Sequence, residues 1–391
     1  GHVPVFVANP HGFPVRTQIE FELQLGHDPE ALRNPKVKLR LDGRDHPCQR
    51  LKAEANVAEP WRVRLATMVK LDPWQVLRLE EHFINDRSEP QWRAPKVTAR
   101  FLSFRSTKFH LRINPKTGLV DHLSLPGESR SLVGPGAFAP AYFADLDHSW
   151  TCGSPKRSPT REVWSVPPAW DAVPAGRFRL AGRADAARLS PPPADKWTKA
   201  TGTAARPLRI IEHGPLRTVV EAMFVCGSSG VVRQYHIGHS DGSLQICDRV
   251  FNNHRDHMLK LMVPLAFEVR DSISEALYSA VERPASRRHE DRTNQRWVAV
   301  RGRHGGKAVF LAVLNTASFA HSLTGRELAL NVLRSPAYSS FNLDPENPRQ
   351  SQRFVPRQDQ GEHMLCFSLM IGRRFAETPV SRAAQLLNTP P

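Results

Sequence analysis

Two carboxylates, a histidine and a tryptophan fall within six consecutive positions of this sequence: Asp145, Asp147, His148 and Trp150. Carboxylates accept hydrogen bonds from hydroxyl groups and an aromatic ring packs on the apolar face of a sugar, so this segment favours a carbohydrate ligand. The two carboxyl groups could also act as acid and nucleophile of a retaining glycosidase, which needs them about 5 Å apart. The alternative is a solvated loop beside a core tryptophan. We predict ligand contact here, without a self-contained catalytic pair.

The densest group of potential metal ligands is the run from His254 to His257, which contains Asp256. A zinc site needs at least three donors that converge on one point. Side chains alternate along an extended strand, so His254 and Asp256 would share one face and His257 would point away. A third donor would come from elsewhere, such as His236. A half-exposed polar strand that leads into a buried segment is the favoured interpretation, and no metal ligand is assigned.

Three common catalytic motifs are missing from the sequence. A nucleophile elbow needs glycine two residues before and after the serine, and segment 227–230 (Gly-Ser-Ser-Gly) fails that spacing for both serines. Segment 305–308 (Gly-Gly-Lys-Ala) lacks the leading glycine and the hydroxyl of a phosphate-binding loop. A dinucleotide-binding fingerprint is absent too. The sequence therefore identifies no catalytic residue.

Hydrophobic and polar residues alternate along most of the chain, which is the pattern of strands with one buried face. Such alternation occurs at 15–25, 37–41, 61–71, 109–113, 244–246 and 328–332. Two continuously apolar runs, Leu216–Cys226 and Ala308–Leu314, are typical of central strands covered on both faces. Helical periodicity is confined to the tail, where Thr378 could cap a helix with Pro379 at its first position. The predicted fold is all-β with a short C-terminal helix.

Composition divides the chain into two β units. The polar segment 88–95 contains two prolines and predicts a link between a first β-sandwich at 1–93 and a large one at 94–391. Eight prolines lie between Pro155 and Pro193. Proline cannot donate to an interior ladder, so a loop excursion from the large sandwich is expected at about 151–206.

Bulk composition excludes several classes of protein. The 391 residues include 54 Lys and Arg against 38 Asp and Glu, a net charge of +16. These basic residues are scattered and form neither a basic helix nor an arginine–aromatic ribbon, so no nucleic-acid partner is predicted. No apolar run is long enough to cross a bilayer, so no membrane association is expected. Five widely spaced cysteines without a CxxC pair predict reduced thiols in a cytoplasmic protein and no disulfide framework.

Three ordered segments resemble the C-terminal region of glycoside hydrolase family 38, the α-mannosidases, and in particular its bacterial and vacuolar-type branch. They are Glu282–Pro284 with Asn294–Val300, Gly325–Leu328 with Leu333–Pro336 and Tyr338, and Asp359–His363. Weaker similarity at 5–10, 113–118, 147–150 and 231–264 extends the resemblance over nearly the whole chain. Two stretches depart from the family: 151–206 is longer and richer in proline, and 252–254 lacks an aromatic and an acidic residue.

This resemblance implies a catalytic β/α barrel and a helical bundle that precede two β-sandwiches in the same protein, the larger one similar to galactose mutarotase. It also implies a zinc ion and an aspartate nucleophile that belong to the barrel and bundle, upstream of Gly1. Neither a nucleophile nor a metal ligand is therefore carried over to this chain. The implied substrate is an α-mannoside or a mannose-containing oligosaccharide.

Loops of the large sandwich would close part of the sugar pocket in such an assembly, because a glycosidase must exclude water around a distorted sugar ring. The residues expected in this wall are Tyr142, Asp145, Asp147 and Trp150. Arg296 is a further substrate-binding candidate, since a guanidinium can hold an acidic loop in place. The alternative for Arg296 is a structural pair across a sheet.

The predicted function is the non-catalytic C-terminal portion of a zinc-dependent retaining α-mannosidase. Two functions of other classes stay open. A free-standing carbohydrate-binding module would bind mannose or mannobiose without zinc. A basic nucleic-acid-binding β protein would show salt-sensitive binding to DNA with a mapped footprint.

Overall fold

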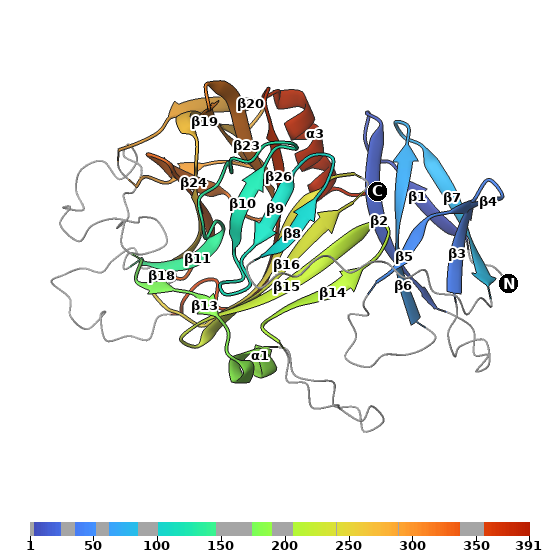
Figure 1. Ribbon diagram of the computed structural model, residues 1–391, viewed down its shortest axis with the longest axis horizontal. Helices are drawn as coiled ribbons and strands as arrows, with labels where there is room; N and C mark the ends of the chain where they lie inside the picture. The colour runs from blue at the N-terminus through green and yellow to red at the C-terminus, as the bar shows by residue number, and fades with distance from the viewer. Residues whose placement is uncertain are drawn as a thin grey trace.

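The computed structural model describes residues 4–24, 36–51, 62–84, 101–145, 174–189, 206–239, 241–287, 289–336 and 356–391. Strands dominate these residues, and the named strands all pair antiparallel. A small β-sandwich lies beside a much larger one, and a helix follows at the C-terminus (Figure 1). The predicted all-β fold class is confirmed. None of the described helices is long and apolar enough to span a membrane.

The small sandwich consists of two sheets, with strand orders β1-β7-β3-β4 and β2-β6-β5. Its strands are β1 (Val5–Ala8), β2 (Val15–Gln24), β3 (Lys36–Leu41), β4 (Arg44–His46), β5 (Cys48–Arg50), β6 (Arg62–Leu71) and β7 (Val76–Ile84). The two longest alternating segments of the sequence are β2 and β6, which pair from Val15↔Leu71 to Gln24↔Arg62. Val15, Ile19 and Leu23 point inward at every fourth position and are buried, so the alternation correctly predicted the buried face.

The large sandwich contains a ten-stranded, a six-stranded and a three-stranded sheet. The ten-stranded sheet consists of β13 (Arg179–Leu180), β14 (Leu208–His213), β15 (Arg217–Cys226), β16 (Ser229–Gly238), β17 (Leu244–Asn252), β19 (Glu268–Ala276), β20 (Ser279–Pro284), β22 (Trp297–His304), β23 (Lys307–Asn315) and β26 (Gly361–Gly372). The six-stranded sheet consists of β11 (Ala139–Ala144), β12 (Gly176–Arg177), β18 (His257–Pro264), β21 (Arg292–Thr293), β24 (Ala320–Thr324) and β25 (Glu327–Arg334). The three-stranded sheet consists of β8 (Leu102–Arg105), β9 (His110–Ile113) and β10 (Val120–Ser124).

One hydrophobic core joins the three sheets of the large sandwich. The sheet of β8, β9 and β10 lies across the ten-stranded sheet (Figure 1), and its residues Leu102, Phe104 and Leu111 belong to the same buried cluster as Val220 and Tyr235. The continuously apolar run predicted as a central strand is β15, in which Arg217–Val225 are all buried. A short helix, α1 (Arg183–Leu189), packs on β15, so both faces of this strand are covered.

The C-terminal helix α3 (Glu377–Asn388) packs on the ten-stranded sheet. Val380 and Ala384, one turn apart, lie in a buried cluster with Trp297 of β22. The prediction that Thr378 caps this helix was wrong. The N-cap is Ala376, in extended conformation and without a side-chain hydrogen bond, so burial of one face stabilises the helix more than capping does.

The expectation that all cysteines are reduced was also wrong. Cys247 of β17 and Cys366 of β26 form a disulfide. They are directly opposite in the register of two neighbouring strands, with Cα atoms 4.2 Å apart. The 119 residues between them in sequence concealed this pairing. Cys226 is a free thiol.

Gln49 connects the small sandwich to the large one through hydrogen bonds. Its Oε1 accepts hydrogen bonds from the backbone N of Leu216 and of Arg217, both at 3.0 Å, and its Nε2 donates to the carbonyl oxygen of Arg217 at 3.1 Å. The Arg217 side chain also pairs with Glu20 of β2. The predicted boundary at 93/94 and most of the excursion at 151–206 lie outside the described residues, so these stay predictions.

A buried histidine gives the fold a dependence on pH. His321 of β24 is fully buried, and its Nδ1 lies 3.0 Å from Oδ1 of Asn294. Burial, followed by the positive charges of Arg292, Arg283 and Lys260, lowers the pKa of His321 to about 3. The folded protein therefore keeps this imidazole neutral at pH values where an unfolded chain would protonate it.

We expect the free energy of unfolding to fall as the pH drops from about 6.5 toward the folded pKa. In that window the unfolded state binds a proton at His321 that the folded state does not bind, which removes about 1.4 kcal/mol per pH unit. Urea unfolding of the wild type and of His321→Gln at several pH values measures the difference in slope. His46→Gln, which changes a histidine whose Nε2 contacts the Met68 carbonyl oxygen, is the control. Equal slopes for wild type and His321→Gln would contradict the prediction.

Candidate functional site

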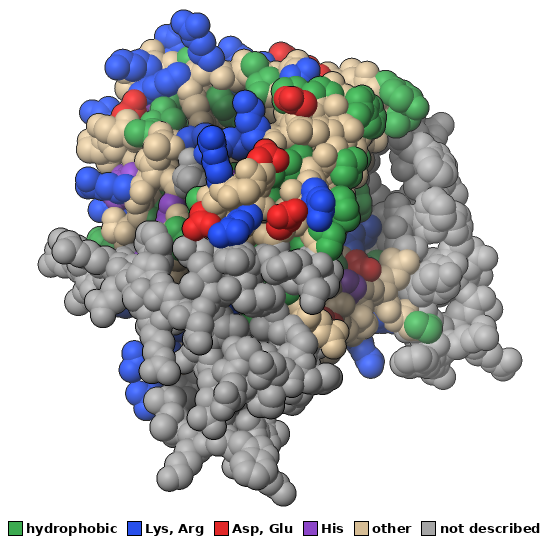
Figure 2. All heavy atoms as spheres, turned by 90° about the vertical axis from the view of Figure 1, so that its right-hand side faces the viewer, with side chains coloured by type: hydrophobic (Ala, Val, Ile, Leu, Met, Phe, Trp, Pro, Cys, Tyr) green, Lys and Arg blue, Asp and Glu red, His purple; other side chains and the backbone are tan. Residues whose placement is uncertain are grey.

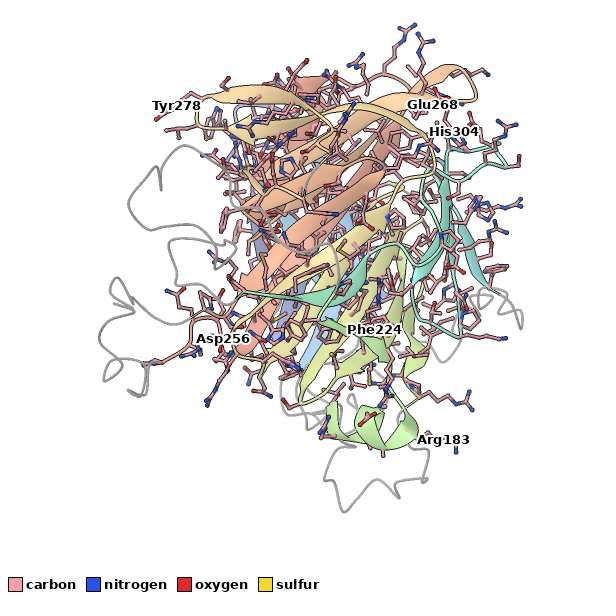
Figure 3. All side chains as sticks on the ribbon, turned by 90° about the vertical axis from the view of Figure 1, so that its left-hand side faces the viewer. Arg183, Phe224, Asp256, Glu268, Tyr278 and His304 are labelled. Carbon is pink, nitrogen blue, oxygen red and sulfur yellow. A yellow bond between two sulfur atoms is a disulfide. The ribbon has the colours of Figure 1, made fainter. Side chains whose placement is uncertain are left out.

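Four connections of the large sandwich meet at one of its ends. Asp145 follows β11, residues 253–256 join β17 to β18, Arg334 ends β25, and Asp359 precedes β26. The neighbouring positions of β11, β18 and β25 in one sheet, and of β17 and β26 in the other, bring these connections together. Asp256 marks this end of the sandwich in Figure 3.

Asp145 forms a two-point ion pair with Arg334. Nε of Arg334 lies 2.8 Å from one carboxylate oxygen and its NH2 group lies 2.9 Å from the other. The side chain of Asp145 has no exposed surface, whereas that of Arg334 is 26% exposed. The backbone N of Arg334 also donates to Oδ2 of Asp359 at 3.1 Å. Both carboxylate oxygens of Asp145 are thus occupied, so this residue fixes the end of β11.

Tyr142 of β11 is a second buried group at this end. Its hydroxyl donates to Oδ1 of Asn252 at 2.7 Å, and Nδ2 of Asn252 donates to the carbonyl oxygen of Asp359 at 2.6 Å. Its ring stacks on His254, with centroids 4.4 Å apart. Burial raises the pKa of Tyr142 to about 12, although a hydrogen bond with Ser229 opposes this shift. The phenol therefore stays neutral and acts as a hydrogen-bond donor.

His254 lies in the connection between β17 and β18, whereas His257 is the first residue of β18, so the predicted strand was wrong at 253–256. Asp256 has a φ of +56°, which redirects the chain, and its carboxylate pairs with Arg357 at 2.8 Å. His254 Nδ1 lies 2.7 Å from the Ser229 hydroxyl. Burial, and then His257, lowers the pKa of His254. Across the described residues, no three His, Cys, Asp or Glu side chains are grouped to hold a metal ion, so the implied zinc ion is assigned to none of them.

A groove of about 480 Å³ borders this cluster, which contributes Arg334 and Asp359 to its lining. Two apolar side chains on the lining, Phe319 and Met364, are each 64% exposed. The remaining lining residues are Ala317, Ala320, Asn331, Val332, Leu333, Gln358, His363 and Leu365. An exposed aromatic ring beside amide, carboxylate and guanidinium groups is an arrangement that can bind a sugar.

The structure brings together some of the predicted site residues and not others. Tyr142 and Asp145 lie together in the cluster, whereas Asp147 and Trp150 lie outside the described residues. Arg296 is held by Glu275 of the neighbouring strand β19, with its Nε 3.0 Å and its backbone N 2.8 Å from the same carboxylate oxygen. This hydrogen bond, and then the charge of Glu275, raises the pKa of Arg296 against the opposing effect of burial. These contacts favour the structural pair.

Sequence reasoning missed three residues of the cluster: Asn252, Arg334 and Asp359. Arg334 and Asp359 do lie within family-like segments, so that resemblance was the available signal. Asn252 lies in the stretch that departs from the family pattern. Its role became visible only through its contact with Tyr142, 110 residues away.

The fold agrees with comparisons to known proteins. Solved structures similar to this chain include a protein in glycosyl hydrolase family 38 from Enterococcus faecalis (11% identity, TM-score 0.63) and an α-mannosidase from Enterococcus faecalis V583 (10% identity, TM-score 0.62). These alignments cover 100% of this chain but only 46% and 45% of those proteins, so the chain spans a little under half their length. No curated protein matches in sequence.

At these identities the structural similarity establishes the fold. In sequence, residues 193–347 match the model of the glycosyl hydrolases family 38 C-terminal domain. That range includes β14 to β25 and two of the three segments that carry the resemblance. Residues 193–347 of this chain are therefore similar to the C-terminal domain of glycosyl hydrolase family 38.

Proposed function

We propose that the chain is the C-terminal, non-catalytic β portion of a zinc-dependent retaining α-mannosidase that hydrolyses terminal α-mannosides in the cytoplasm. The observation that carries the proposal is the family 38 C-terminal domain at 193–347 within a chain whose whole length aligns with family 38 structures. The zinc ion and the nucleophile would belong to a catalytic barrel and helical bundle of the same protein.

The role of this portion would be to close and support the sugar pocket. The Asp145–Arg334 pair fixes the point where the chain leaves β11, and positions 147 and 150 follow directly in sequence. Tyr142 anchors the same strand to Asn252. A fixed wall excludes water and orients the sugar, and a displacement of about 1 Å can lower the rate about 100-fold.

We expect the isolated chain to leave a nitrophenyl α-mannoside intact and the polypeptide that also carries the barrel to hydrolyse it. A zinc chelator should abolish the activity of the longer polypeptide, and added zinc should restore it. Turnover by the purified chain alone at about 1 s⁻¹ or faster, within the range of typical enzymes, would overturn the proposal.

A free-standing carbohydrate-binding module is the second candidate, and the groove with its exposed Phe319 favours it. We expect such a module to bind mannobiose with a roughly millimolar to micromolar Kd and to lose binding in Phe319→Ala, because the ring would pack on the sugar. Isothermal titration calorimetry measures both. Tyr278→Ala is the matched control, since Tyr278 is 99% exposed at the tip of the β19–β20 hairpin (Figure 3). No heat at saturating mannobiose would exclude the module.

A further inference from the structure

The outer face of the three-stranded sheet carries basic and hydroxyl side chains. The side chains of Leu102, Phe104 and Leu111 on these strands point toward the core. The side chains that alternate with them therefore point to the opposite face of the sheet. Directly opposite residues of antiparallel strands share a face, and the register gives two rows. The six residues of this basic face are Arg105, His110 and Ser124 in one row and Ser103, Arg112 and His122 in the other.

Hydrogen bonds orient one side of the basic face. The NH2 group of Arg112 donates to Nδ1 of His122 at 2.8 Å. Nε2 of His122 lies 3.0 Å from the hydroxyl of Ser124, which donates to the carbonyl oxygen of Glu128 at 3.0 Å. Because Nδ1 of His122 accepts a hydrogen bond, this imidazole is neutral and carries its proton on Nε2. The guanidinium of Arg112 is thereby held in place.

The positive charge of the basic face has no local counter-charge. In the part of the chain that the structure describes, no carboxylate pairs with Arg105 or with Arg112, and the buried Nε of Arg112 has no hydrogen-bond partner. Glu128, whose carbonyl oxygen accepts the hydrogen bond of Ser124, is paired through its side chain with Arg373. Burial, and then the positive charge of Arg112 and His110, lowers the pKa of His122 to about 4.

We propose that the basic face binds a phosphate group, either as free phosphate or as the monoester of a sugar. Guanidinium groups bind phosphate oxygens with two parallel hydrogen bonds. Arg105 and Arg112 are diagonal neighbours on adjacent strands, about 7–8 Å apart at the backbone, so their long side chains can converge on one tetrahedral anion. The hydroxyl of Ser103, opposite Arg112, adds a donor.

Part of this face is open to a ligand, at Arg105 and Arg112, whereas His122 and Ser124 are buried. Figure 2 shows Lys, Arg and His side chains gathered along its left margin, the side that carries β8, β9 and β10 in front in Figure 1. Arg105 is exposed and Arg112 is half-buried. The guanidinium of Arg112 also lies 4.8 Å from the ring centroid of Phe101, so an aromatic ring borders the proposed phosphate position on one side.

Isothermal titration calorimetry of the whole chain tests the proposal, with inorganic phosphate, mannose 6-phosphate and mannose as probes. We expect phosphate and mannose 6-phosphate to bind and mannose to give no heat at this face. Tighter binding of mannose 6-phosphate than of phosphate identifies a sugar monoester as the ligand, and equal binding identifies free phosphate. Arg105→Gln and Arg112→Gln should each weaken binding about tenfold, the loss of one charge-assisted hydrogen bond.

The matched control is Arg16→Gln, which removes the same charge from an exposed strand position of the small sandwich. Thermal unfolding of each variant shows whether it is folded, and the exposed position of Arg105 makes Arg105→Gln the safer of the two variants. Binding that falls equally in Arg16→Gln would mean attraction to net charge alone and would overturn the proposal. Absence of heat with both phosphate probes would overturn it as well.

Discussion

Asp248→Ala is expected to lower the free energy of unfolding by about 3–5 kcal/mol, because it leaves a buried arginine without its counter-charge. Arg233 and Asp248 are opposite each other on β16 and β17, and both side chains are fully buried. Two hydrogen bonds of 2.7 Å join the guanidinium to the two carboxylate oxygens. A third, from NH1 of Arg233, reaches the carbonyl oxygen of Phe138 at 2.5 Å.

Urea unfolding at constant pH measures this effect and allows a double-mutant cycle. Arg233→Met combined with Asp248→Leu should recover much of the loss, since apolar groups of similar volume leave no charge without a partner. The neighbouring Arg249 pairs with Glu362 at about half exposure on both sides, so Arg249→Ala is a matched control with an expected loss below about 1 kcal/mol. Equal losses for Asp248→Ala and Arg249→Ala would contradict the argument.

Period-two alternation predicted several of the strands, because a strand with one buried face shows that face directly in its sequence. Thus segments 15–25 and 61–71 became β2 and β6, and the apolar runs at 216–226 and 308–314 became β15 and β23. The order of strands was not predictable in the same way. Nothing local to 361–372 indicates that β26 lies between β17 and β23, and the Cys247–Cys366 disulfide follows from that placement alone.

The candidate site was only partly predictable for the same reason. Asp145 and Tyr142 were found because acidic and aromatic residues cluster near them in sequence. Their partners Arg334 and Asn252 lie 189 and 110 residues further along the chain, so no local pattern could identify them. The turn at 253–256 was read as a strand, because polar residues between two strands fit a half-exposed strand as well as a turn until the positive φ of Asp256 is known.

The Asp145–Arg334 pair predicts an asymmetry between its two partners. Arg334→Met leaves the carboxylate of Asp145 without a partner, and the Asp145 side chain has no exposed surface. This variant should lower the free energy of unfolding by about 3–5 kcal/mol. Asp145→Asn removes the charge and leaves Arg334 in contact with water through its 26% exposed side chain. This second variant should lose only about 1–2 kcal/mol. Urea unfolding of both variants, with Arg249→Ala as the control, measures the difference.

The same pair links stability to the proposed activity. If Asp145 fixes a wall of the sugar pocket, Asp145→Asn in the polypeptide that carries the barrel should lower kcat/KM for a nitrophenyl α-mannoside about tenfold or more, because a small displacement of the wall affects the transition state. Arg249→Ala should leave kcat/KM unchanged. A destabilised Asp145→Asn variant with full activity would assign the pair a structural role alone. The stability of this sandwich would then be independent of the hydrolysis proposed for the catalytic barrel.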